Sequence, residues 1–172
     1  MNTRLPSYFF FFFVLFSLVS NAQDNKEKRP SPPAKVTGVV NGSTITIDYS
    51  KPSVKGRKIW GGLVPYKEVW RTGANEATTF ETSKDIKVEG KVLPAGKYAL
   101  FTIPTESSWT VIFNKTSKQW GAYDYKEKDD QLRITVNPTK SKQFTEQLTF
   151  FIEGNKIFFL WENLEVGFKV TE

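Results

Sequence analysis

The sequence predicts a single all-β domain, an antiparallel β-sandwich or jelly-roll-like fold with few or no helices. Three observations favour this class: short segments alternate apolar and polar residues, turn residues recur about every 8–12 residues, and no amphipathic helix of any length is evident. A closed barrel is the alternative architecture. Aromatic residues, 15% of the chain, would supply much of the core packing.

The first expected element is a hairpin that joins strands 36–40 and 44–49. Its turn is Asn41-Gly42-Ser43, and Asn-Gly favours the positive φ angles of a tight hairpin turn. Apolar and polar residues alternate along the second strand, which is typical of a sheet with one face in water.

The remaining strands are expected to follow in order along the chain. The segment 156–161 is apolar on both faces, which predicts a central strand that is covered on both sides. Turns are expected at Gly154-Asn155 and at Glu162-Asn163. The predicted strands after the first hairpin are 78–82, 86–88, 91–93, 98–103, 109–114, 131–137, 147–153, 156–161 and 165–170.

Residues 1–22 have the pattern of a secretory signal peptide. Arg4 precedes an apolar run over residues 8–19, and Ser20 and Ala22 are small residues at the positions that signal peptidase reads. The run is too short to cross a bilayer, which takes about 20 residues. No Cys follows it, so we expect a soluble periplasmic or secreted protein, without stable membrane insertion, that is not a lipoprotein.

The charged, proline-rich residues 23–34 predict a flexible tether, and residues 35–172 predict one β-sandwich domain. With no Cys, the chain has no disulfide framework and no thiol chemistry. The formal net charge is +6, but most lysines are scattered among acidic residues. Because no dense basic tract with interleaved aromatic residues is present, nucleic-acid binding is not expected.

The chain contains neither His nor Cys, which excludes a Ser-His-Asp arrangement and the usual zinc sites. Gly-rich phosphate loops are also missing. The acidic residues within 126–130 are interleaved with lysines, as in a solvated turn rather than a calcium loop. We therefore predict no cofactor, no metal site and no catalytic residue.

Two enzyme mechanisms remain as alternatives. One is a carbohydrate-active hydrolase with paired carboxylates, and its candidate acids are Asp48, Glu68, Glu76 and Asp124. The other is a Ser–Lys arrangement, for which the chain offers Ser50-Lys51 and Ser53 with Lys55. Proximity in sequence is weak evidence for either pair in space.

The most unusual segment is residues 49–79, where Trp, Arg and Asn lie among glycines. Arg can grip a carboxylate or phosphate at two points, and Trp supplies a flat apolar wall. The functional hypothesis is a cleft for a polar or anionic small molecule or glycan, formed by Arg57, Trp70, Arg71, Asn75 and Trp120. In the alternative, Trp60, Trp70 and Trp120 fill the core, while the arginines pair with acids or stack on aromatic rings.

Two details qualify this hypothesis. Trp70 and Arg71 are neighbours, so in a strand they would face opposite sides and at most one could enter a given pocket. Residues 120–125 contain three aromatic residues and predict either a flap over the sandwich or a sugar-stacking platform.

Four segments also carry a resemblance to a known family. They are Tyr49-Ser50-Lys51-Pro52-Ser53 with Lys55-Gly56-Arg57, Val69-Trp70-Arg71-Thr72-Gly73-Ala74-Asn75-Glu76-Ala77-Thr78, Leu93-Pro94-Ala95-Gly96-Lys97-Tyr98, and Trp120-Gly121. The chain resembles, over roughly residues 35–170, the exported bacterial proteins called domain of unknown function 2911. The resemblance implies an exported, mostly β domain and no established activity.

The sequence therefore leaves three functions open. The first is a non-catalytic binding or interaction module of the cell envelope. The second is the carbohydrate-active hydrolase, and the third is a structural envelope protein without a small-molecule site.

Overall fold

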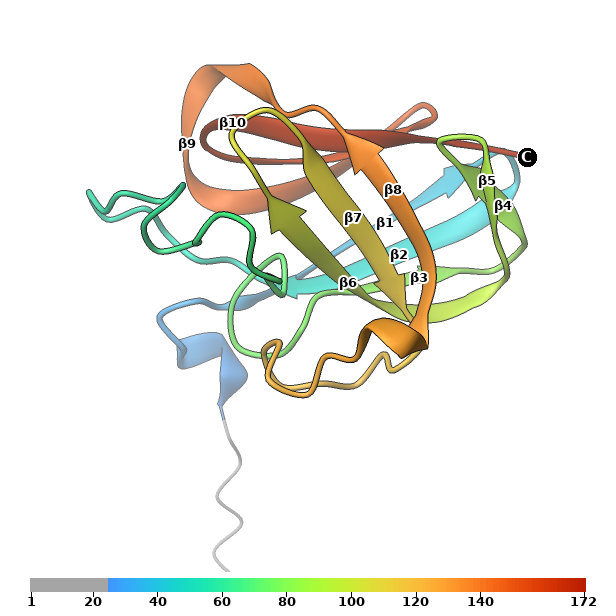
Figure 1. The fold of residues 1–172 in the computed structure, drawn as a ribbon, viewed down its shortest axis with the longest axis horizontal. Helices are drawn as coiled ribbons and strands as arrows, with labels where there is room; N and C mark the ends of the chain where they lie inside the picture. Colours follow the sequence, from blue (N-terminus) through green and yellow to red (C-terminus); the bar gives the residue numbers. More distant parts are fainter. Residues whose placement is uncertain (1–24) are drawn as a thin grey trace, which may run out of the picture.

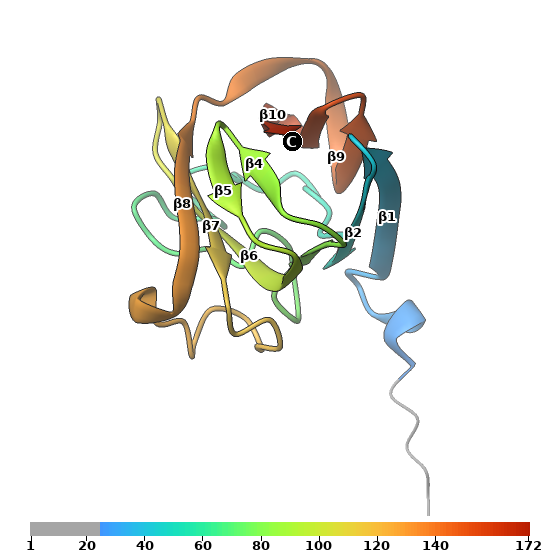
Figure 2. The same ribbon diagram turned by 90° about the vertical axis from the view of Figure 1, so that its right-hand side faces the viewer.

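The computed structural model describes residues 25–172, in which ten strands form two antiparallel sheets (Figure 1, Figure 2). The larger sheet has the order β1-β2-β3-β6-β7-β8, and the smaller one has the order β5-β4-β10-β9. This arrangement confirms the predicted all-β sandwich. The expected signal peptide, residues 1–22, lies outside the described residues.

The strands and two short 3-10 turns follow one another along the chain. They are η1 (Lys26–Lys28), β1 (Pro33–Val40), β2 (Ser43–Ser50), β3 (Thr79–Thr82), β4 (Ile86–Val88), β5 (Lys91–Leu93), β6 (Gly96–Pro104), β7 (Trp109–Asn114), η2 (Glu127–Asp129), β8 (Asp130–Val136), β9 (Thr139–Glu153) and β10 (Lys156–Thr171).

The predicted first hairpin is confirmed. Strands β1 and β2 pair in register from Val40 with Ser43 outward, and the two turn residues Asn41 and Gly42 have φ angles of 48° and 71°. Asn and Gly are the residues that adopt this left-handed conformation most readily, which explains why they stand at the turn.

Strand β10 folds back on itself. A straight strand of this length would separate its ends by roughly 50 Å, at about 3.3 Å per residue. Instead, the Val170 amide donates to the Asn155 carbonyl at 2.8 Å, and Glu162, with a φ of 53°, stands between the two halves. The red ribbon reverses direction within β10 (Figure 1). The turn expected at Glu162-Asn163 therefore corresponds to this reversal.

Strand β9 begins at Thr139, well before the predicted start at residue 147. Its first half is polar and mostly exposed, so hydrophobic alternation could not mark it as a strand. Pairing with β10 continues along it across two register shifts around Glu162. Tertiary pairing, rather than a sequence pattern, makes this half a strand.

The main core lies between the two sheets and includes a cluster of four tryptophans, Trp60, Trp70, Trp109 and Trp161. The ring centroids of the contacting pairs are 5.0–6.3 Å apart, mostly in edge-to-face geometry. Such contacts add to the free energy gained by burying the rings. Trp60 and Trp70 thus pack in the core, as the alternative to the cleft hypothesis expected.

A second, smaller cluster covers the outer face of the larger sheet. Leu100 in β6 belongs to the main core, whereas its neighbour Phe101 belongs to this outer cluster, because successive strand residues face opposite sides. Val69, Ala122 and Tyr125 pack against the outer cluster from two long connections. Residues 66–78 and 115–129 therefore cover part of this face. Within residues 25–172, no helix is long and apolar enough to cross a membrane.

Candidate functional site

A pocket of about 490 Å³ lies on the outer face of the larger sheet. Its floor includes Asp48 of β2, Thr79 of β3 and Lys97 of β6, which alternate with core residues of the same strands. Residues 26–34 and 117–119 form its walls. The N-terminal turn and the connection before β8 lie at the same end of the sandwich (Figure 1, Figure 2).

Cationic side chains outnumber acidic ones around the pocket. Glu76 pairs with Lys26 at 2.9 Å and with Arg29 at 3.0 Å. Asp48 pairs with Lys97 at 3.4 Å, and with a lysine outside the pocket lining. Lys118 makes no ion pair with any residue of the described chain. The two carboxylates are thus already compensated, and the remaining charge favours an anionic ligand.

Two lining residues carry buried polar atoms without a hydrogen-bond partner among residues 25–172, Thr79 Oγ1 and Gln119 Oε1. The amide nitrogen of Gln119 donates to the Thr116 carbonyl at 2.6 Å and to Asn114 Oδ1 at 3.2 Å. These bonds orient the amide and leave its oxygen as an acceptor. Because most buried polar atoms in proteins are paired, two unpaired ones in one pocket make it a candidate ligand site.

Glu76, Trp120 and Asn75 of the domain hold the N-terminal segment against the pocket. Arg29 Nη1 donates to both Glu76 oxygens, at 3.2 and 3.0 Å, and its guanidinium carbon lies 5.8 Å from the centroid of the Trp120 ring. Asn75 Nδ2 donates to the Ser31 carbonyl at 2.9 Å and to Ser50 Oγ at 3.3 Å. Residues 29–31, in the predicted tether, therefore contact the domain in the structure.

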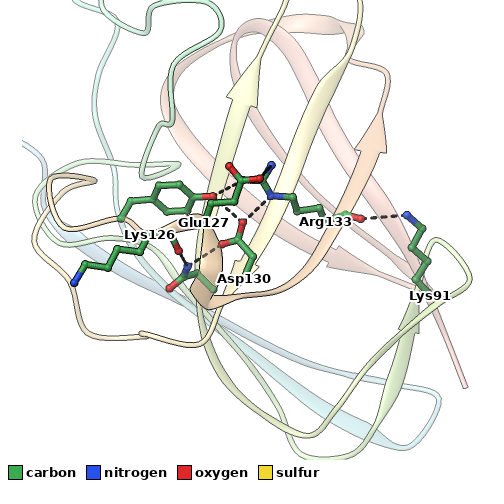
Figure 3. Close-up of polar contacts among 7 residues, drawn as sticks. Lys91, Lys126, Glu127, Asp130 and Arg133 are labelled. Carbon is green, nitrogen blue, oxygen red and sulfur yellow. Dashed lines mark hydrogen bonds and ion pairs between the residues drawn. The ribbon is translucent and has the colours of Figure 1, made fainter.

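The connection that carries Gln119 and Trp120 is anchored by a polar network around Asp130 (Figure 3). Tyr125 Oη donates to Asp130 Oδ2 at 2.7 Å, and Arg133 Nε donates to the same oxygen at 2.6 Å. Burial and the bond to Asp130 raise the pKa of Tyr125 to about 12, so the phenol remains a donor. Because its groups bond to one another, we assign this network a supporting role.

Of the five predicted site residues, Asn75 and Trp120 lie beside the pocket, next in sequence to its lining residues Glu76 and Gln119. Trp70 packs in the core, where its ring stacks on Trp161. The other two predicted residues, Arg57 and Arg71, do not line the pocket.

Arg57 is satisfied within its own loop. Its guanidinium donates to the carbonyls of Ser53 and Val54, at 2.5 and 3.1 Å. Trp70 forms an isolated bridge with Thr102 of β6 and packs against the core, whereas Arg71 Nη1 lies beside Gly121. Neither side chain lines the pocket.

Sequence reasoning did not single out most residues that line the pocket. Strand alternation could have placed Thr79 and Lys97 on the outer face beside Asp48, since each is followed by an aromatic residue, Phe80 or Tyr98, that faces the core. No local pattern indicates that Arg29 and Lys118 approach the same pocket, because they come from connections that are distant in sequence. That proximity arises only in the folded domain.

Two of the hydrolase candidates, Asp48 and Glu76, do line the same pocket. Burial alone would raise the pKa of Glu76, but hydrogen bonds from Lys26, from its own backbone amide and from Arg29 outweigh burial and lower that pKa to about 2. A glycosidase needs one carboxyl group whose pKa is raised, so that it is protonated and can act as the general acid. Glu76 has the opposite property.

The lowered pKa of Glu76 predicts a specific acid sensitivity. The ion pairs contribute stability above the ordinary pKa of 4.5, and this contribution is lost as the pH falls from there toward 2. Because the Glu76 side chain is 38% exposed, we expect the loss to be about 1 kcal/mol or less. Urea denaturation of the wild type and Glu76→Gln between pH 7 and pH 2 measures it, with the exposed Glu68→Gln as control. Equal pH dependence of all three proteins would contradict the prediction.

The comparisons with known proteins agree with the extent of this fold. The sequence model of a family described as "Protein of unknown function (DUF2911)" matches residues 31–170. No curated protein and no solved structure matches the chain significantly. The matched range includes both sheets and the connections that cover the outer face, and it begins just after Arg29.

Proposed function

We propose that this chain, which belongs to the DUF2911 family of proteins of unknown function, is an exported, non-catalytic domain that binds a small anionic ligand in the pocket on its larger sheet. One observation carries the proposal. The pocket combines a surplus of cationic side chains with two buried polar atoms, Thr79 Oγ1 and Gln119 Oε1, that lack partners among the described residues.

The chemistry of the lining suggests a ligand with both an acidic group and hydroxyl groups. Lys118 is available for the acidic group. Ser50 Oγ accepts a hydrogen bond from Asn75, so its own proton can be donated to a ligand, while Gln119 Oε1 can accept one. The volume of about 490 Å³ is within the usual range for small-molecule sites, roughly 300–1,000 Å³. An acidic sugar, such as a uronic acid or a sugar phosphate, meets these requirements.

Export is supported by the sequence of residues 1–22, with Arg4, the apolar run and Ala22 at the expected cleavage site. We place the domain in the periplasm or outside the cell. A ligand there would be an envelope glycan fragment or a small acidic metabolite.

A carbohydrate-active hydrolase is the second candidate, because Asp48 and Glu76 line one pocket. The same substrate class would then be cleaved rather than only bound. The low pKa of Glu76 argues against a role as general acid. Chromogenic glycosides distinguish the two candidates, since only a hydrolase would release the chromophore.

A thermal-shift screen with uronic acids, sugar phosphates and matched neutral sugars tests the binding proposal. We expect acidic sugars to raise the Tm, and a ligand at 100 times its Kd adds about 2.7 kcal/mol to the free energy of unfolding. Thr79→Val keeps the side-chain shape but removes the unpaired hydroxyl, so it should preserve the fold and weaken binding about tenfold.

The exposed Thr135→Val is the matched control for this screen and should bind like the wild type. Equal responses to acidic and neutral sugars would contradict the role of the cationic side chains. No response across the whole panel would favour a structural envelope protein.

A further inference from the structure

We infer that Arg71 forms a second anion-binding site, separate from the pocket, for the carboxylate or phosphate group of a small molecule. Arg71 is half-buried, and its Nε is fully buried without a hydrogen-bond partner. Its guanidinium makes no hydrogen bond or ion pair with any of residues 25–172. This inference uses different residues from the proposed function and does not depend on it.

The other arginines of the described chain all have partners for their guanidinium groups, unlike Arg71. Arg29 and Arg133 pair with carboxylates, and Arg57 donates to two carbonyl oxygens of its own loop. An arginine side chain keeps its positive charge in a folded protein, so Arg71 carries that charge without an acidic partner among the described residues. A buried donor without an acceptor is costly, and of the guanidinium nitrogens only Nε is in that position, so the other two can receive an anion that approaches from the solvent.

The backbone around Arg71 holds the guanidinium at one place. The Trp70 amide donates to the Thr102 carbonyl at 2.8 Å, and the Thr102 amide donates back to Trp70 at 2.9 Å. Trp70 packs against the core, whereas Arg71 Nη1 lies against Gly121. The Gly121 amide in turn donates to the Asn75 carbonyl at 3.1 Å, which fixes the facing connection.

Gly121 is required for this close approach. A Cβ atom at position 121 would lie 3.0 Å from Arg71 Nη1 and 2.9 Å from the Tyr123 ring, and the residue has a φ of 65°. Glycine accepts such a φ more readily than a residue with a side chain. The site is therefore the guanidinium of Arg71 beside the Gly121 backbone.

The surroundings also indicate the kind of ligand. The planar guanidinium can donate to a carboxylate or phosphate with a two-point fork. Tyr123 is 81% exposed on the same connection and offers a flat surface for the body of the ligand. Arg71 does not line the pocket, so the two sites can be tested separately.

The test is an NMR titration of the arginine Nε–H resonances in 15N-labelled protein produced from the full chain. Sodium phosphate or sodium acetate replaces sodium chloride at constant ionic strength. We expect a saturable shift of the Arg71 resonance with at least one of the two anions, and the anion that binds identifies the class. The Arg57 resonance is the internal control, because its Nε already donates to the Val54 carbonyl.

Variants separate this site from the pocket. Arg71→Met keeps an apolar stem without the charge, and we expect the apparent affinity for the anion, measured at the Gly121 amide, to fall at least tenfold. Thr79→Val should leave the Arg71 titration unchanged. A static Arg71 resonance, or a linear drift equal to that of Arg57, would overturn the inference. The wild-type titration alone tests anion binding at Arg71, even if Arg71→Met does not fold.

Discussion

Replacing Trp109 with Ala should lower the free energy of unfolding by about 3–5 kcal/mol, the largest loss of stability that we expect from a single substitution. The Trp109 side chain is 1% exposed and packs edge-on against Trp60, with ring centroids 5.0 Å apart. It also contacts Trp70 and Phe159. Its removal leaves a cavity that is bordered by these three rigid rings, which cannot collapse into it without moving the backbone.

The loss would be a large share of the 5–15 kcal/mol that is typical of a whole domain. For a chain of this size it corresponds to a fall in Tm of roughly 6–20 °C. Urea denaturation and calorimetry would measure both quantities. The matched control is Trp120→Ala, because Trp120 is 54% exposed and should change stability by less than about 1 kcal/mol. Similar losses in the two variants would contradict the assignment of Trp109 to the core.

Much of the fold could be predicted because its strands obey local rules. The β1–β2 hairpin follows from Asn41-Gly42 and from alternation along residues 44–49. The first half of β9 could not be predicted, because its residues are polar and mostly exposed, and it is a strand only through pairing with β10. Local patterns report which face of a strand is buried, and they carry no information about a strand whose faces are both wet.

The candidate site was less predictable, since residue type alone does not distinguish packing from binding. Trp70 and Trp120 are the same amino acid in two unusual segments, yet Trp70 packs in the core and Trp120 is exposed beside the pocket. Arg57 and Arg71 also differ, because only Arg57 finds carbonyl oxygens in its own loop. Such differences depend on partners that the chain acquires when it folds.

Replacing Gly167 with Ala should cost about 2–3 kcal/mol, a large effect for the addition of one methyl group. Where β10 folds back, a Cβ at position 167 would lie 2.5 Å from the Cβ of Phe158 and 2.8 Å from the Ile157 carbonyl oxygen. Neither atom can move away by a change of rotamer. The methyl group would therefore push apart the two halves of β10, which lie between β4 and β9 in the smaller sheet.

Gly38→Ala is the matched control, because Gly38 is also a strand glycine without positive φ. The three atoms nearest to a Cβ at position 38 would all belong to the side chain of Ile152, the closest at 2.9 Å, and this side chain can shift at a lower cost of about 1 kcal/mol. Urea denaturation of both variants measures the difference, and hydrogen exchange of the Val170 amide reports the fold-back directly. If Gly167→Ala were no more destabilising than Gly38→Ala and the Val170 amide stayed protected, the two halves of β10 would not be packed as closely as described.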